Sequence, residues 1–389
     1  MRFLTAEKIH NGQGWLPDGS VLEVADNGAI ISISNEPNNE AVFYEGILAP
    51  GFVNVHCHLE LCHMKGLIPE HTNLIPFLKN IPLHRNDFTE EQKKAARHEG
   101  YSELVRNGIV AVGDIANTTD SLDVRALDQL HCYTFVESLG FNAANAARSF
   151  NYAIATYNTY ATQHAGEKLL KQAIVPHAPY SVSSALFKLI DGHKDGVTIA
   201  IHNQESEEEN KYFTTKEGSV PDLLHAFGID DSLFTPSGRS SLQSYLEWLS
   251  PGHPMIFVHN TYTKREDVQF AQGSRKEVFW CLCPNANLYI ENKLPDVEMF
   301  VSEGANICIG TDSLASNHQL CVLSELYSIK EQYPQISWET LLTWGTMNGA
   351  MALQLHDVVG TIETGKKPGI VQITGINALS ARPAVVRII

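Results

Sequence analysis

After residue 50, short apolar runs alternate with longer amphipathic stretches along most of the chain. The apolar runs have the length of buried strands, and the stretches between them have the period of surface helices. One such stretch, residues 89–108, opens with a Thr-x-x-Gln capping-box pattern and closes on a glycine. Eight apolar runs can be traced, at residues 51–56, 108–115, 131–138, 172–177, 197–202, 255–259, 278–284 and 305–312.

This alternation predicts parallel strands joined by helices, and eight repeats over about 260 residues favour a (β/α)8 TIM barrel over an open sheet. The two ends of the chain differ from the middle. "PDGS" and "DNG" punctuate short strands near the N-terminus, and the tail has no helical period. We therefore expect an α/β protein with a catalytic barrel at 49–359. We also expect a small composite β-sandwich domain built from residues 1–48 and 360–389.

The composition of the chain argues against some classes of binding partner. The net charge is −16, from 28 basic and 44 acidic residues, which argues against a nucleic acid or an anionic membrane as partner. The N-terminus lacks the pattern of a secretory signal, and no stretch approaches 18 apolar residues. The seven cysteines form no C-x-x-C pair. These features predict a cytoplasmic protein with free thiols that acts on a small molecule.

The stretch "NVHCHLELCH" holds several potential metal ligands and permits three kinds of metal site. His58 and Glu60 match the H-x-E of zinc base deaminases, but the P-C-x-x-C half of that signature is absent. A Cys/His zinc knuckle would need a second ligand pair elsewhere, which is also absent. The remaining interpretation is an H-x-H pair on a strand, in which His56 and His58 point to the same side and Cys57 points away.

Four other apolar runs also end in a histidine or an acid. In a (β/α)8 barrel the carboxyl ends of all strands face one mouth, where the active site is built. Imidazole and carboxylate ligands without a thiolate suit Zn²⁺ or Fe²⁺, and an open position makes such a site catalytic. The residues at these ends are His177, His202, His259 and Asp312.

The motifs "GFVNVHCHLE", "VPHAPYSVS", "IHNQES", "FVHN" and "GTDS", in this order, resemble the amidohydrolase superfamily. Within it they are most similar to the cytosine deaminase and chlorohydrolase-like (ATZ/TRZ) branch, and the likeness covers nearly the whole chain. The resemblance implies one divalent metal, because the fourth strand has no lysine at its mouth. The implied metal ligands are His56, His58, His202 and Asp312.

The resemblance also implies catalytic roles. Glu205 would be the proton shuttle, and His259 and Asp312 would orient the water or take its proton. The remaining acids of the run 205–209 are interpreted as surface or lid charge. His177 would contact the substrate. The polar stretches 285–297 and 313–320, which include Ser313, are predicted to form loops that line the pocket.

One departure from the family concerns substrate binding. Thioadenosine and adenosylhomocysteine deaminases carry a substrate-binding glutamate after the H-x-H, and the matching region "NIPLHRNDF" has none. Glu60 or Glu70 could replace it. We predict Glu60, His63 and Ser313 as substrate contacts beside His177. The stretch "HLELCHMKG" and the short tail are similar to aminofutalosine deaminase-like proteins.

These observations predict a metal-dependent aminohydrolase that deaminates an aminated heterocycle, such as a purine or purine nucleoside, with water activated by the metal. Two alternatives stay open. The same barrel could cleave another C–N bond or a C–Cl bond, or it could bind metal without catalysis. Members of the family are commonly dimers, so a homodimer is a possible assembly.

Overall fold

The structure, a computed structural model, describes residues 1–164, 166–194, 196–376 and 382–389. Eight parallel strands form the barrel, and each coincides with one of the predicted apolar runs to within a few residues. The runs were recognisable because these strands are buried on both faces, so their sequences are continuously apolar. The strands are β5 (Phe52–Cys57), β6 (Ile109–Ala116), β7 (His131–Ser138), β8 (Leu170–Pro176), β9 (Ile199–Asn203), β10 (Met255–His259), β11 (Val278–Leu282) and β12 (Asn306–Ile309).

The barrel consists of two four-stranded sheets, in the orders β5-β6-β7-β8 and β12-β11-β10-β9. Backbone hydrogen bonds near the carboxyl ends of the strands join the two sheets. On one side the N–H groups of Thr311 and Asp312 both donate to the carbonyl of His56 at 3.0 Å. On the other side the N–H of His202 donates to the carbonyl of His177 at 3.0 Å. The closure of the barrel therefore brings these predicted site residues together.

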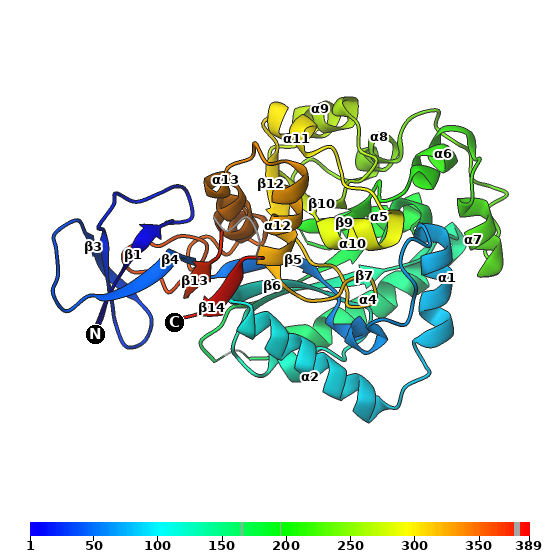
Figure 1. The fold of residues 1–389 in the computed structure, drawn as a ribbon. Helices are drawn as coiled ribbons and strands as arrows, with labels where there is room; N and C mark the ends of the chain where they lie inside the picture. The colour runs from blue at the N-terminus through cyan, green and yellow to red at the C-terminus, as the bar shows by residue number, and fades with distance from the viewer. Residues whose placement is uncertain (165, 195, 377–381) are drawn as a thin grey trace.

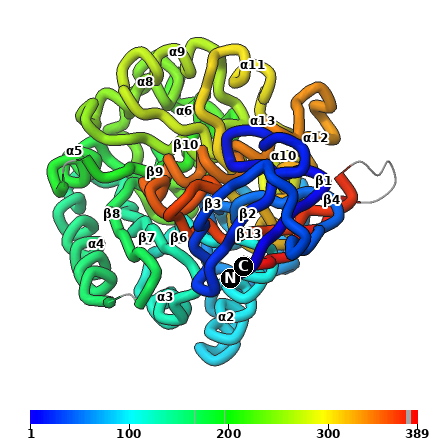
Figure 2. Tube along the Cα trace, turned by 90° about the vertical axis from the view of Figure 1, so that its left-hand side faces the viewer, coloured from blue at the N-terminus to red at the C-terminus, as the bar shows by residue number. Residues whose placement is uncertain are grey.

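Helices surround the strands as a ring, with the sheet from the two termini in front in the view of Figure 2. The predicted capping box is confirmed at α2, where the Thr89 side chain accepts from the Gln92 backbone. The α-helices are α1 (Leu74–His84), α2 (Glu90–Arg106), α3 (Leu122–Arg125), α4 (Ala146–Ala161), α5 (Ser184–Asp191), α6 (Glu207–Thr215), α7 (Val220–Ala226), α8 (Ser241–Tyr245), α9 (Arg265–Ser274), α10 (Pro284–Glu291), α11 (Val297–Ser302), α12 (Val322–Gln332), α13 (Trp338–Thr343) and α14 (Gly349–Ala352).

Short helical turns connect several of these elements. No helix among the described residues is long and apolar enough to cross a membrane. The 3₁₀ turns are η1 (Leu59–Met64), η2 (Ala143–Asn145), η3 (Pro179–Ser181) and η4 (Leu246–Trp248), and η5 (Trp344–Asn348) is a π-helical turn.

Strands from both ends of the chain form one six-stranded mixed sheet in the order β14-β13-β4-β1-β2-β3. The composite β-layer is confirmed, and it is one hydrogen-bonded sheet rather than a sandwich of two. Its strands bury a small apolar core of their own. The division of the chain at residues 48 and 360 stays a prediction. The strands are β1 (Arg2–Ile9), β2 (Val21–Val24), β3 (Ile30–Ser34), β4 (Val42–Pro50), β13 (Ile370–Thr374) and β14 (Ala384–Arg387).

Candidate metal centre and substrate cavity

The histidines and the aspartate from the strand ends meet at one point. One ligand atom each from His56, His202, His259 and Asp312 lies within 4.8 Å of the others. The Nε2 of His58 lies 3.1 Å from Nε2 of His56 and 3.3 Å from Nε2 of His202. It also lies 3.3 Å from Oδ1 of Asp312. The structure thus brings together all four predicted metal ligands, with His259 beside them.

Three of the strand ends turn sharply where they reach this cluster. Gln204 (φ 45°), His259 (φ 72°) and Asp312 (φ 56°) adopt left-handed backbone conformations, which are unfavourable for residues other than glycine. Such strain, of order 1–3 kcal/mol per residue, persists only where surrounding contacts hold it. For His259, the following N–H of Asn260 donates to the carbonyl of Asn203 at 3.0 Å and ties the end of β10 to β9.

Hydrogen bonds on the outer side of two imidazoles determine which nitrogen faces the cluster. The Nδ1–H of His202 donates to the carbonyl of His177 at 2.8 Å, and the Nδ1–H of His259 donates to Oδ1 of Asn287 at 2.8 Å. Each Nε2 therefore keeps a free lone pair toward the cluster. Burial lowers the pKa of His58 to about 3 and also lowers the pKa values of His202 and His259. The imidazoles are thus neutral, as metal ligands must be.

The carboxylate of Asp312 is held by the loop that follows β12. Its Oδ2 accepts a hydrogen bond from the hydroxyl of Ser316. The preceding Thr311 exchanges hydrogen bonds with the Asn54 side chain, at 2.8 and 3.1 Å. These contacts leave Oδ1 facing His56 and His58 at 3.4 and 3.3 Å. Three imidazoles and one carboxylate, buried and close together, are a donor set that Zn²⁺ prefers.

Glu205 follows β9 and enters the same space. It is buried, and its Oε1 lies 3.7 Å from Nε2 of His259. Burial raises the pKa of Glu205 well above its ordinary value, and the negative charge of Asp312 adds to this effect. A carboxyl group with a raised pKa can hold a proton at neutral pH and pass it on.

A cavity of about 500 Å³ opens onto the cluster. Its base contains the predicted residues His58, His177, His202, Glu205, His259, Asp312 and Ser313. Its outer wall is apolar and comes mainly from α1 and α7, which lie at the end of the barrel away from the terminal sheet (Figure 1). The cavity therefore combines polar chemistry at its base with an apolar entrance.

Not all of the predicted substrate contacts lie in this cavity. His177 and Ser313 line it, whereas Glu60 and His63 are not among the lining residues. The Glu60 carboxylate accepts from the N–H groups of Asn117 and Thr118 and from Arg85. It therefore holds the loop after β6. The ring of His63 packs edge-on against Phe88.

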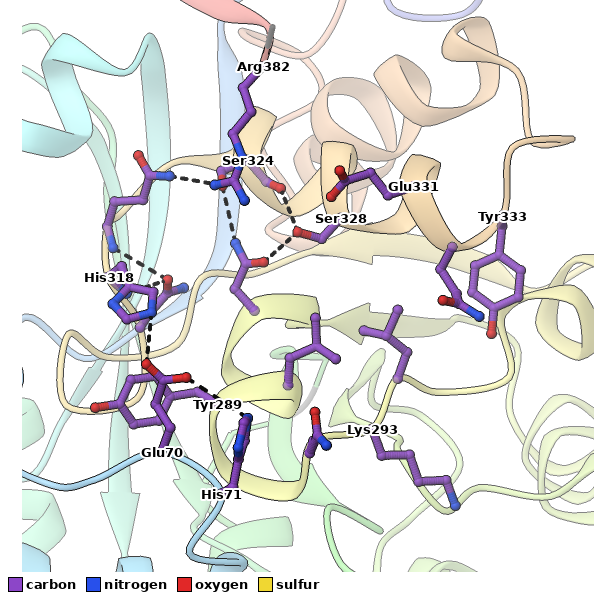
Figure 3. A pocket seen from close by; sticks show the side chains of 17 residues that line it. Glu70, His71, Tyr289, Lys293, His318, Ser324, Ser328, Glu331, Tyr333 and Arg382 are labelled. Carbon is purple, nitrogen blue, oxygen red and sulfur yellow. Dashed lines mark hydrogen bonds and ion pairs between the residues drawn. The ribbon is translucent and has the colours of Figure 1, made fainter. Parts of the chain in front are cut away.

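Glu70 lies in a second, more polar cavity, shown in Figure 3. There its carboxylate is 3.3 Å from Nε2 of His318, beside Tyr289. The stretch 285–297 contributes to this second cavity, and none of its residues lines the first. The prediction of a loop is also wrong, because most of the stretch is helix α10, which has Pro284 in its first turn and the left-handed Asn292 as its C-cap. Within this stretch, Asn287 contacts the metal centre, because its Oδ1 accepts from the Nδ1–H of His259.

Several residues that line the cavity were not predicted from the sequence. Asn117 and Arg85 follow a strand and a helix without a recognisable motif, and both line the cavity. Glu137 is the penultimate residue of β7 and also lines the cavity, and burial raises its pKa to about 8. An acid near the end of a predicted strand was a usable signal for Glu137.

Glu209 corrects the interpretation of the acidic run. The side chain is fully buried, so it is not surface charge. Its carboxylate accepts from the backbone N–H of Gln204 at 2.9 Å and from the hydroxyl of Ser241. It thereby supports the left-handed turn that precedes Glu205. The helical period of α6 points Glu207 outward and Glu209 inward.

A closed parallel barrel with a buried histidine–aspartate metal site at the carboxyl ends of its strands defines a metal-dependent hydrolase. The chain belongs to the amidohydrolase family, whose model matches residues 47–387. The predicted family and fold are confirmed.

Proteins similar to this chain include deaminases and, among solved structures, a chlorohydrolase. The chain is 25% identical over 384 residues to adenosine deaminase from Helicobacter pylori, covering 96% of this chain and 90% of the relative. It is similar to the solved structure of Helicobacter pylori aminofutalosine deaminase with methylthio-coformycin (TM-score 0.80, 22% identity, 95% and 91% covered). It is also similar to atrazine chlorohydrolase from Arthrobacter aurescens, complexed with zinc (TM-score 0.74, 15% identity, 98% and 89% covered).

Proposed function

We propose that this protein removes the amino group of a purine nucleoside or a nucleoside-like compound that carries an apolar substituent. The reaction class, metal-dependent deamination, agrees with the named deaminases among the relatives. One observation carries the proposal: the buried Glu205 carboxyl lies beside His259 and the metal ligands at the base of an apolar-walled cavity. This arrangement suits attack on a ring carbon bearing an amine.

We assign one Zn²⁺ to His56, His58, His202 and Asp312, and the zinc in the solved chlorohydrolase supports this choice of metal. When bound, the metal supplies water activated for attack at neutral pH. His202 is held in the correct tautomer by the carbonyl of His177. The Asp312 carboxylate is oriented by Ser316.

The protein side chains supply the proton transfers. Glu205 donates a proton to the ring nitrogen next to the amine-bearing carbon, which makes that carbon electrophilic. His259 and Asp312 orient the attacking water and accept its first proton. The Glu205 carboxylate takes the second proton from the added hydroxyl as the carbonyl forms and passes it to the departing amine, which leaves as ammonia. The proton held by Asp312 then restores Glu205 to its protonated form. Acid–base help of this kind contributes about 10²–10⁴-fold to a rate.

The apolar wall indicates where the rest of the substrate lies. Phe77, Leu78 and Ile81 come from α1, and Leu224 and Phe227 come from α7 or its end. Burying an apolar substituent against them contributes about 25 cal/mol per Å² of area. We therefore expect nucleosides with an apolar 5′ group to be better substrates than adenosine.

The test is release of ammonia from the zinc-loaded protein with adenine, adenosine, 5′-deoxyadenosine and 5′-methylthioadenosine. We expect the highest kcat/KM with the 5′-methylthio compound. Chloride release from a chlorotriazine in the same series tests the alternative hydrolase chemistry. If no compound bearing an amine released ammonia, the proposal would be wrong.

A further inference from the structure

We propose that Glu137 binds the sugar hydroxyl groups of the substrate and thereby makes the enzyme select nucleosides over free bases. The inference rests on the proposed function, and it concerns a residue outside the metal-ligand and proton-shuttle set. Glu137 is only 5% exposed, yet it lines the substrate cavity. A carboxyl group buried beside a cavity is costly unless hydrogen-bond donors satisfy it.

The existing contacts leave the Glu137 carboxyl group partly unsatisfied. Its Oε2 accepts one hydrogen bond, from the Asn117 side chain at 2.8 Å. Its Oε1 lies 3.3 Å from Nδ1 of His202, but that N–H is already directed to the carbonyl of His177 at the shorter distance of 2.8 Å. Within the described part of the chain, Glu137 forms no ion pair with lysine or arginine. Ionised or protonated, the Glu137 carboxyl group has more acceptor lone pairs than these contacts use, so capacity remains for donors from a ligand.

A second acceptor lies next to Glu137. The Ser181 hydroxyl lies 3.1 Å from the carbonyl of Ala178 and 2.7 Å from Nδ1 of His177. We assign its proton to the carbonyl, so that the Nδ1–H of His177 donates to Ser181 Oγ. The Nε2 of His177 therefore carries a lone pair. Ligand atoms of Glu137, His177 and His202 lie within 4.8 Å of one another. Two neighbouring acceptors, Glu137 and His177, match two neighbouring O–H donors, the arrangement in a sugar cis-diol.

The same three residues are a poor second metal site. A cation there would need the Nδ1 lone pair of His202, and this nitrogen carries the proton that bonds to the His177 carbonyl. Losing that bond would also release the tautomer that the first metal requires. Neutral hydroxyl donors require no such change, so they fit the existing hydrogen bonds.

Position within the cavity supports this assignment. Glu137 lies on the Nδ1 side of the His202 ring, whereas the metal cluster lies on its Nε2 side. The imidazole ring of His202 thus separates the proposed hydroxyl site from the reacting centre, and the hydroxyl site lies on the side of β7 and β8. The apolar wall of α1 and α7 remains free for a 5′ substituent. An amine, a diol and an apolar group can then occupy three different parts of one cavity.

The experiment compares adenosine with 2′,3′-dideoxyadenosine, in the zinc-loaded wild type and in Glu137→Gln. We expect the wild type to prefer adenosine at least tenfold in kcat/KM, mainly through KM. In Glu137→Gln we expect this preference to fall to about twofold, because adenosine loses affinity and the dideoxy compound changes little. An equal loss with both compounds would overturn the proposal and leave Glu137 as a support for His202.

Two controls separate this outcome from a general loss of structure or metal. Zinc content is measured for each variant. Asp231→Asn removes another buried carboxylate, which bonds to Tyr212 outside the cavity lining, and it should leave the preference unchanged. Where turnover is absent, calorimetric titration of the wild type with both nucleosides tests Glu137 independently of deamination. Equal binding of the two, or binding of neither, would contradict the inference.

Discussion

At the residue scale, the chemistry depends on which atom of each side chain faces the cavity. His202 and His259 both present Nε2 because their Nδ1–H groups have acceptors, the His177 carbonyl and Asn287. Glu205 is aimed by the left-handed Gln204, whose N–H is held by the buried Glu209. The H-x-H pattern predicted His56 and His58 as metal ligands, and the family resemblance implied the role of Glu205. No local pattern could identify Asn287 as the partner of His259.

Replacing Glu205 with glutamine tests the proton shuttle. Glutamine keeps the shape of the side chain and cannot transfer the proton, so kcat should fall by about 10²–10⁴-fold. Zinc content, measured by elemental analysis, should stay the same, because Glu205 is not among the assigned ligands. Glu207→Gln is the matched control on the exposed side of α6 and should retain full activity. Loss of zinc in Glu205→Gln would show that the role is wrong.

At the scale of elements, the pattern of apolar residues predicted the barrel strands. It did not predict helix α10, whose ends are marked by cap residues and not by apolar periodicity. Residues 285–297 look polar, yet Pro284 at the first turn and the left-handed Asn292 after the last turn are helix start and stop signals. The apolar wall of the cavity could not be predicted from the sequence either, because apolar residues on α1 and α7 show the same periodicity whether they face the core or a cavity. Only the packing of α1 against α7 distinguishes these two cases.

Replacing Phe227 with serine tests the apolar wall. Phe227 lines the cavity and is 47% exposed, so the change should affect ligands more than folding. We expect KM for 5′-methylthioadenosine to rise about 5- to 20-fold, equivalent to about 1–2 kcal/mol of lost apolar contact, with little change for adenosine. Leu233→Ser, at a side chain that is 96% exposed and outside the lining, is the control. A similar rise for both substrates would argue against a 5′ subsite.

At the scale of the whole molecule, folding buries ionisable groups, so the free energy of unfolding depends on pH. His131 begins β7, and its Nδ1 accepts from the N–H of Leu169 at 3.0 Å. His10, from the N-terminal segment, is fully buried. Burial lowers the pKa of each to about 4, with nearby Lys168 adding to the effect at His131. Both histidines are therefore neutral in the folded protein over most of the pH range.

Acidification should destabilise the protein through these two histidines. In the unfolded chain each binds a proton near pH 6.5, whereas in the folded protein each does so only near pH 4. Stability is therefore lost as pH falls from 6.5 toward 4, by about 2 kcal/mol per histidine at pH 5. Urea unfolding at pH 7.5 and pH 5 should show a smaller difference in His131→Gln than in the wild type. His225→Gln, at an exposed site, should match the wild type. Equal pH dependence in all three proteins would refute the assignment to His131.

The assembly of the chain is also a property of the whole molecule, and the predicted homodimer remains a prediction.

The sequence alone determined the order of strands and helices, the H-x-H pair and the polar residues at the strand ends. These are local properties, because hydrophobic period and strand-end position are written in neighbouring residues. Tertiary structure decided which distant residues meet. It placed Asp312 against His56, directed Glu60 to the loop after β6 instead of the cavity, and set Glu137 beside His202. Spacing along one strand predicts which side chains share a side, but the partners across the barrel depend on closure of the sheet, which residue spacing does not encode.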